Sequence, residues 1–176
     1  MSTVFSSISD SYHKDEEVET ARLCHSQGSF KIWNAHHSHI EGAKCLADEN
    51  RHIFGFITRG AFYDAYQAGT LIVATRGEDV VGFLRYHHRK RDLQTTLYDI
   101  CVSGLIRGQG LGRGMISMLV DCCRTAGREI IVLKCPSQLA AYDFYERYGF
   151  TCVDTLVGKR QKLNVWRLDL TSRSQQ

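Results

Sequence analysis

The sequence predicts a mixed α/β fold with a mostly antiparallel central sheet of six or seven strands and about four flanking helices. Short runs of apolar and β-branched residues, bounded by turn residues, recur along the chain and are typical of strands. Apolar residues recur at helical spacing in four other segments, each followed by a glycine that can end a helix. The order of these segments separates the chain into a meander and a later strand–helix alternation.

The first half of the chain contains the segments expected to form the meander. An alternating strand is expected over 29–34, before amphipathic helices that end at Gly55 and Gly69. Three strands then follow, connected by a turn over 76–79 and a basic loop over 87–92. The expected helices cover 40–54 and 61–68, and the expected strands cover 70–75, 80–87 and 95–103.

The second half alternates strands with helices. A helix over 110–126 carries one apolar stripe, and the near-continuous apolar run over 129–135 is typical of a strand buried on both faces. Pro136 and Ser137 are expected to open a helix over 137–148 that ends at Gly149. Strands over 150–155 and 163–170 close the fold as a hairpin.

Length and composition indicate a globular domain over 21–176 preceded by a flexible polar arm over 1–20. The net charge of +3 suits an anionic ligand without requiring nucleic acid. No apolar run approaches the roughly 20 residues that span a bilayer, and the first residues lack a signal-peptide pattern. We therefore expect a cytoplasmic protein with no membrane partner, whose seven cysteines are mostly buried and reduced.

The chemistry-bearing segment is the glycine-rich turn over 107–112, which lies between an expected strand and an expected helix. Glycines let the backbone approach a ligand closely, and the free amides at a helix start favour an anion such as a pyrophosphate. Arg107 and Arg113 add positive charge for flanking phosphates. The P-loop motif is absent, and the glycine spacing does not fit a Rossmann fingerprint. On glycine content alone, a plain tight turn remains an alternative.

Two blocks of sequence resemble the GNAT superfamily of N-acetyltransferases. In the first, Arg107, Gly110 and Gly112 fill the [Q/R]-x-x-G-x-[G/A] signature five residues after Val102. The second block, about 30 residues later over 140–150, resembles the A-x-x-F-Y-x-x-x-G-F segment of the same superfamily. The order of elements also agrees from about residue 29 to 170. The resemblance implies a sheet whose fourth and fifth strands splay apart.

The resemblance also implies acetyl-CoA as co-substrate, bound without a metal. Its pyrophosphate would lie on the amides from Arg107 to Gly112, and its pantetheine would pair with the backbone of the preceding strand. Gln138 replaces the asparagine found in many members, so its contact with the cofactor rests on a longer side chain. The expected cofactor-binding residues are Ile100, Cys101, Val102, Arg107, Gly108, Gln109, Gly110, Leu111, Gly112, Arg113 and Gln138.

Two proton transfers then need side chains, one from the attacking amine and one to the leaving thiolate. Tyr145 matches the tyrosine that acts as general acid in many members, and Asp99 is the candidate base, by resemblance to aminoglycoside 3-N-acetyltransferases. Packing of Tyr145 in the core, and a structural hydrogen bond for Asp99, remain alternatives. His87 and His88 are other candidate bases, since histidine titrates near neutrality.

Several functions remain compatible with these features. The primary expectation is transfer of an acetyl group to a primary amine of a small molecule or protein. A nucleic-acid-modifying acyltransferase and a non-catalytic CoA-binding module are the alternatives, and a homodimer is possible. The helices over 40–68 are expected to line the acceptor site, with Arg59, Tyr63, Asp64 and Tyr66 as candidates. The histidine cluster over 36–39 lacks a second group of ligands, so no metal site is expected.

Overall fold

The expected mixed sheet is present in the structure, a computed structural model that describes residues 25–27, 30–138, 141–158 and 161–171. The described residues form one sheet in the order β1-β2-β3-β4-β5-β6-β8-β7, in which only β5 and β6 run parallel. The strands are β1 (His25–Gln27), β2 (Phe30–Asn34), β3 (Leu71–Arg76), β4 (Asp79–His88), β5 (Gln94–Val102), β6 (Ile130–Pro136), β7 (Thr151–Val157) and β8 (Lys162–Asp169).

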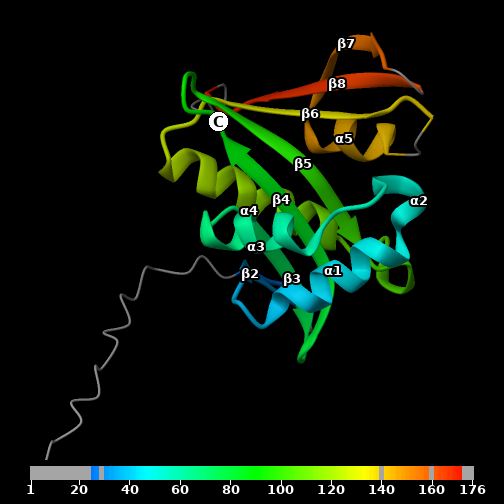
Figure 1. Cartoon of the computed structure of the whole chain (residues 1–176). Helices are drawn as coiled ribbons and strands as arrows, with labels where there is room; N and C mark the ends of the chain where they lie inside the picture. The colour runs from blue at the N-terminus through cyan, green and yellow to red at the C-terminus, as the bar shows by residue number, and fades with distance from the viewer. Residues whose placement is uncertain (1–24, 28–29, 139–140, 159–160, 172–176) are drawn as a thin grey trace, which may run out of the picture.

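Helices cover both faces of this sheet (Figure 1). In the described residues, α1, α2 and α3 lie against one face, and α4 and α5 lie against the other. A short 3-10 turn, η1 (Gly104–Ile106), connects β5 to α4. The helices are α1 (His39–Glu49), α2 (Arg51–Phe54), α3 (Arg59–Gln67), α4 (Leu111–Thr125) and α5 (Tyr142–Tyr148).

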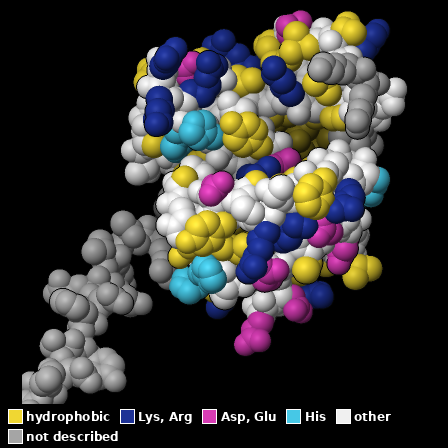
Figure 2. Space-filling model, in the orientation of Figure 1, with side chains coloured by type: hydrophobic (Ala, Val, Ile, Leu, Met, Phe, Trp, Pro, Cys, Tyr) yellow, Lys and Arg dark blue, Asp and Glu magenta, His cyan; other side chains and the backbone are white. Residues whose placement is uncertain are grey.

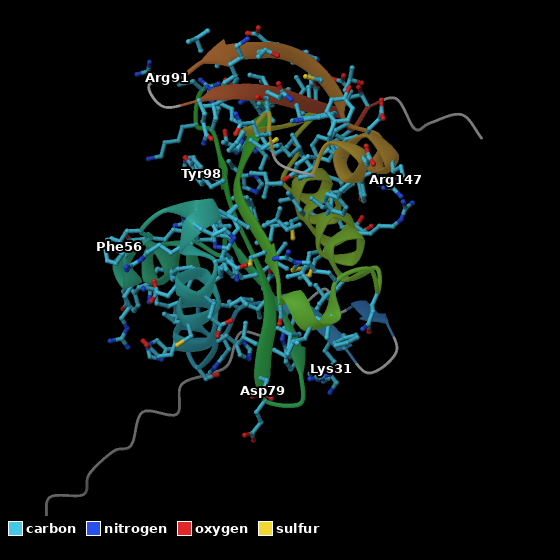
Figure 3. The ribbon with its side chains drawn as sticks, turned by 90° about the vertical axis from the view of Figure 1, so that its right-hand side faces the viewer. Lys31, Phe56, Asp79, Arg91, Tyr98 and Arg147 are labelled. Atoms are coloured by element: carbon cyan, nitrogen blue, oxygen red, sulfur yellow. The ribbon has the colours of Figure 1, made fainter. Side chains whose placement is uncertain are left out.

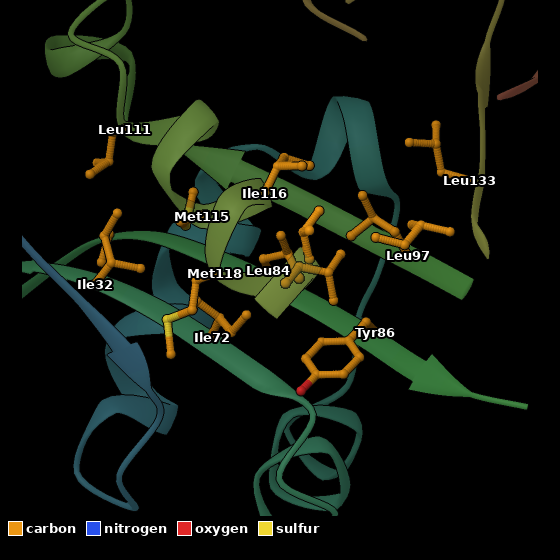
Figure 4. Packing of buried hydrophobic residues seen from close by; sticks show 14 of the residues in the cluster. Ile32, Ile72, Leu84, Tyr86, Leu97, Leu111, Met115, Ile116, Met118 and Leu133 are labelled. Atoms are coloured by element: carbon orange, nitrogen blue, oxygen red, sulfur yellow. The ribbon is translucent and has the colours of Figure 1, made fainter. Parts of the chain in front are cut away.

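The sheet separates two hydrophobic clusters. The larger cluster packs α4 against the sheet through Met115, Ile116 and Met118, all fully buried (Figure 4). The smaller cluster packs α1 and α3 against the opposite face, with Phe62 and Phe83 at its centre. Burial of apolar side chains on both faces is the main stabilising contribution in such a fold. It fixes β5, which lies between the two clusters, from both sides.

The parallel pair β5 and β6 separates partway along its length. β5 pairs with β6 only from Gln94 to Leu97, whereas its pairing with β4 continues to Val102. Meanwhile β6 stays paired with β8 as far as Pro136. Figure 1 shows the two strands diverging from their shared end. The backbone of residues 98–102 therefore has an edge that pairs with no described strand, and this confirms the predicted splay.

Two predicted helices differ from the structure. The single helix expected over 40–54 is interrupted at Asn50, whose side-chain amide donates to the Leu46 carbonyl oxygen (2.8 Å). The helix expected from 137 begins only at Tyr142, because Pro136 still pairs with Leu163 and the Ser137 amide donates to the Lys162 carbonyl (3.0 Å). Strand pairing therefore extends β6 through the expected helix start.

The remaining predicted segments agree within one or two residues at their ends. A three-residue strand, β1, extends the sheet beyond the predicted first strand. The predicted arm over 1–20 lies outside the described residues. In the described part of the chain, no helix is long and apolar enough to cross a lipid bilayer.

Candidate functional site

The turn between β5 and α4 has the backbone geometry expected of an anion site. Gly108 and Gly110 have φ angles of 82° and 81°, a conformation that side chains with a Cβ rarely adopt. Gly110 immediately precedes α4, and its carbonyl accepts the first helical bond, from Gly114 (2.9 Å). Amides in the first turn of a helix lack intrahelical acceptors, so the start of this 15-residue helix can bind negative charge.

Gly112 has a different role, which is close packing. A Cβ at this position would lie 3.2 Å from Cζ of Phe144, on α5. The absence of a side chain therefore lets α5 approach the first turn of α4. This contact forms one wall of a cavity beside the turn.

The turn cavity, as we call it, has a volume of about 580 Å³ and lies beside the start of α4. Eight of the eleven expected cofactor-binding residues line it. Aromatic residues of α5 complete the wall, and the Arg113 guanidinium lies 5.5 Å from the Tyr148 ring centroid. The lining residues are Ile100, Val102, Ile106, Arg107, Gly108, Gly110, Leu111, Gly112, Arg113, Ala141, Phe144, Tyr145, Arg147 and Tyr148.

A second cavity, the strand cavity, lies where β5 and β6 diverge and has a volume of about 430 Å³. It shares Ile100, Val102, Arg107, Ala141 and Tyr145 with the turn cavity, so the two cavities meet at these residues. The space-filling view shows the surface hollowed between the upper and lower halves of the molecule (Figure 2). The other lining residues are Ile53, Phe54, Tyr98, Asp99, Cys101, Lys134, Cys135 and Pro136.

Arg107 connects these cavities to the helical face of the molecule. Its Nε donates to the Val102 carbonyl and its Nη2 donates to Oδ1 of Asn50, both at 3.2 Å. Asn50 is buried and sits at the junction of α1 and α2. The Arg107 side chain was expected to add charge for a phosphate. Its guanidinium also forms hydrogen bonds within the protein while lining both cavities.

Tyr145 occupies the meeting point of the two cavities. Its side chain is 6% exposed and packs against the rings of Phe150 and Trp166, with both centroids 5.7 Å away. Burial, followed by the nearby Cys135 and Asp99, raises the pKa of the Tyr145 hydroxyl above its ordinary value. The hydroxyl therefore stays protonated near neutral pH, so it carries a hydrogen that it can direct toward a ligand in either cavity.

Asp99 lines the strand cavity but is paired with Arg85 on the neighbouring strand. Nε and Nη2 of Arg85 both donate to Oδ2 of Asp99, at 2.9 and 2.5 Å, and both side chains are about 15% exposed or less. Arg85 also donates to the Ala61 carbonyl (3.2 Å) and lies 5.2 Å from the Phe62 ring centroid. The two hydrogen bonds from Arg85 therefore hold the carboxyl group of Asp99 in a fixed position.

Several expected site residues lie away from both cavities. Gln109 and Gln138 are exposed, and neither lines either cavity, whereas Cys101 lines only the strand cavity. Arg59 forms an ion pair with Glu41, and Tyr63 and Tyr66 pack around His37. Arg59, Tyr63, Asp64 and Tyr66 line neither of the two cavities.

The sequence analysis missed residues that do line the cavities. Ile53 and Phe54 from α2 and Lys134 from β6 face the strand cavity, and Phe144 faces the turn cavity. Arg85 was missed as well, although it lies directly opposite Asp99 in the β4–β5 ladder. Opposite charges on adjacent strands are a recognisable signal, but a bulge between Arg85 and Tyr86 shifts the register of this hairpin.

The histidines over 36–39 are engaged in local packing. The His36 amide donates to Nδ1 of His39 (3.0 Å), and the His39 ring stacks on Trp33. Among the residues that the structure describes, no group of three His, Cys, Asp or Glu side chains could hold a metal ion.

Comparisons with known proteins agree with this geometry. Residues 14–165 match the family described as acetyltransferase (GNAT) domain, and the chain therefore belongs to the GNAT acetyltransferase family. A comparison with curated protein sequences gives no match.

Many solved structures share the fold. Ard1 from Thermoplasma volcanium is 18% identical with a TM-score of 0.72, and the alignment covers 80% of this chain and 97% of that one. The yncA acetyltransferase structure from Salmonella typhimurium, which contains acetyl-CoA, is 19% identical with a TM-score of 0.68, covering 84% and 97%. The ribosomal-protein-S18-alanine N-acetyltransferase from Escherichia coli is 17% identical with a TM-score of 0.67, covering 84% and 99%.

Proposed function

We propose that this protein transfers the acetyl group of acetyl-CoA to a primary amine by direct attack of the amine on the thioester. The observation that carries this proposal is the meeting of two cavities at Tyr145. One cavity lies beside the glycine turn at the start of α4, and the other lies where β5 and β6 diverge. Such an arrangement lets two substrates approach one reacting centre from different sides.

The turn cavity fits the chemistry of acetyl-CoA. The amides from Arg107 to Gly112 and the guanidinium of Arg113 would hold the pyrophosphate, because helix-start amides and arginine both favour phosphate oxygens. The free backbone edge of residues 98–102 would pair with the amides of the pantetheine arm. A thioester at the end of that arm would lie near Tyr145, which lines both cavities.

The reaction requires one bond to form, one to break and two protons to move. The amine nitrogen bonds to the thioester carbonyl carbon, and the carbon–sulfur bond breaks with its electron pair on sulfur. Tyr145 donates its hydroxyl proton to the sulfur, and the nitrogen loses a proton to Asp99, directly or through water. Asp99 can orient the acceptor ammonium in either case, since its position is fixed by Arg85.

Two measurements test this function in sequence. Acetyl-CoA should raise the melting temperature in a concentration-dependent manner, because it binds the folded state. A thiol-release assay with a panel of small amines and free N-terminal peptides should then detect CoA formation that depends on both substrates. No thermal shift at saturating acetyl-CoA would contradict the proposal. A shift without transfer to any amine would favour the non-catalytic CoA-binding alternative.

A further inference from the structure

A third cavity lies at the end of the molecule where β5 and β6 are still paired. We call it the basic cavity; its volume is about 700 Å³. Four of its eleven lining residues are lysine or arginine, and no carboxylate lines it. The lining residues are His87, Arg89, Lys90, Arg91, Gln94, Thr96, Leu97, Tyr98, Val132, Leu133 and Lys134.

The cations of this cavity are held by an ordered loop. Nη1 of Arg128 donates to the carbonyls of Arg89 and Asp92, each at 2.9 Å, and the Arg89 amide donates to Gln94 (2.9 Å). These bonds turn the loop's backbone acceptors toward Arg128 and leave its side chains on the outer surface. The site is therefore preorganised, so little ordering would be needed when a ligand binds.

Most of this charge is unpaired within the described residues. Arg89 lies 3.3 Å from Asp92, but Lys90, Arg91 and Lys134 form no ion pair with any residue that the structure describes. Figure 2 shows Lys and Arg side chains gathered at the upper left, over the β4–β5 loop. A concave surface with excess positive charge attracts anionic groups and concentrates them locally.

The basic cavity continues into the strand cavity. Tyr98 and Lys134 line both, and Tyr98 is 56% exposed at the boundary. In the side view, Arg91, Tyr98 and Phe56 lie on one flank of the molecule, and Arg147, which lines the turn cavity, lies on the other (Figure 3). A ligand in the basic cavity would thus be on the flank opposite the anion-binding turn.

From this placement we propose that the acceptor is an acidic peptide, whose carboxylates occupy the basic cavity while its N-terminal amine enters the strand cavity. This inference rests on the proposed acetyl transfer and names its substrate class. Arg107 and Lys134 contribute positive charge to the lining of the strand cavity, and Asp99 contributes the carboxyl group that would orient the amine. Acidic residues next to the amine would offset the repulsion from Arg107 and Lys134 during binding.

A peptide fits these observations better than a polynucleotide. Four lysine or arginine residues line the basic cavity, and the chain carries a net charge of only +3. A polynucleotide would carry its negative charge well beyond one cavity.

The test uses two eight-residue peptides with free amino-terminal serine, carrying three glutamates or three glutamines at positions two to four. We expect KM for the glutamate peptide to be about tenfold lower at low salt, with similar kcat, since complementary rim charges act mainly on binding. Raising the salt concentration should shrink this difference. The double variant Lys90→Ala/Arg91→Ala should raise KM for the glutamate peptide and leave the glutamine peptide unchanged.

The matched control is Arg76→Ala/Arg124→Ala, which removes two exposed positive charges away from the three cavities. It should keep the full preference for glutamate. Equal KM values for both peptides in the unmodified protein would overturn the inference while leaving acetyl transfer intact. Stronger displacement of a fluorescein-labelled glutamate peptide by oligothymidylate than by unlabelled peptide would overturn it in favour of a polynucleotide.

Binding of the labelled glutamate peptide, followed by fluorescence anisotropy, separates this inference from the proposed function. Salt-sensitive binding that Lys90→Ala/Arg91→Ala abolishes supports the basic cavity even if no amine is acetylated. Absence of such binding overturns the inference whether or not other amines are acetylated. Circular dichroism and melting temperatures establish that both double variants are folded.

Discussion

The turn cavity and the strand cavity are built from different parts of the polypeptide. The turn cavity depends on backbone conformation, because Gly108 and Gly110 take positive φ angles just before the amides that begin α4. The strand cavity depends on side chains from α2, β5 and β6, and on Ala141 and Tyr145 at and within α5. A backbone site needs glycine at fixed spacing and leaves a motif in the sequence. A side-chain site can be assembled from distant segments and leaves none.

The largest expected effect falls on the residue that both cavities share. Tyr145→Phe removes the hydroxyl while keeping the aromatic packing with Phe150 and Trp166. If Tyr145 protonates the leaving thiolate, kcat should fall by at least about 100-fold, with little change in acetyl-CoA affinity. Steady-state CoA release and isothermal titration with acetyl-CoA measure the two quantities.

Tyr148→Phe is the matched control for this change. Tyr148 lies three residues further along α5, lines the turn cavity only, and places its hydroxyl 3.2 Å from Oγ of Ser117. Removing that hydroxyl should leave kcat within a few-fold of its original value. Equal losses in the two variants would mean that Tyr145 contributes to packing and not to proton transfer.

Variants of Asp99 and of its partner Arg85 test whether Asp99, which lines the strand cavity, acts as the general base. Asp99→Asn should lower kcat by roughly 50-fold if the carboxylate takes the proton, because the amide cannot accept it. Arg85→Met breaks the same ion pair but leaves the carboxylate in place. The two variants distinguish the roles: if Asp99 acts as the base, kcat should fall much further in Asp99→Asn than in Arg85→Met. If both variants lose the same activity and stability, the pair is structural.

The same contrast explains what could be predicted from the sequence. The elements that carry strong periodicity, such as α4 and β6, were located to within a residue or two. The glycine turn was located because its geometry restricts the residue type. In contrast, the interruption at Asn50 arises from one side chain bonding to the Leu46 carbonyl, and the extension of β6 to Pro136 arises from pairing with β8. Neither the interruption at Asn50 nor the extension of β6 follows from the hydrophobic pattern of the neighbouring residues.

The side chains that pair across the sheet could not be predicted from the sequence either. Arg85 and Asp99 are 14 residues apart, and their pairing depends on a bulge that hydrophobic alternation does not reveal. The contact between Arg107 and Asn50 joins residues 57 apart in the sequence. The motifs therefore predicted which residues belong to the site. The side chains that hold those residues in position could be identified only from the folded structure.

The backbone character of the turn cavity can be tested with two glycines of one loop. Gly108→Ala introduces a Cβ where φ is +82° and nothing lies within 4 Å, so only backbone strain is changed. That strain costs about 1–2 kcal/mol, and we expect the Kd for acetyl-CoA to rise about five- to tenfold as the turn relaxes. Gly104→Ala also meets no atom within 4 Å and lacks a positive φ, so its affinity should be unchanged. Equal affinities in both variants would show that the turn geometry does not determine binding.

The smallest expected effect concerns the hydrogen bond between Asn50 and Arg107, a residue that lines both cavities. Asn50→Ala removes the acceptor for Nη2 of Arg107 and the donor to the Leu46 carbonyl. Each such hydrogen bond contributes about 0.5–1.5 kcal/mol, so stability should decrease by one to two such amounts. Because Arg107 lines both cavities, KM for acetyl-CoA and for the amine should each rise about threefold. A rise in only one KM would mean that Arg107 serves that cavity alone, and that the two cavities are energetically independent despite their shared wall.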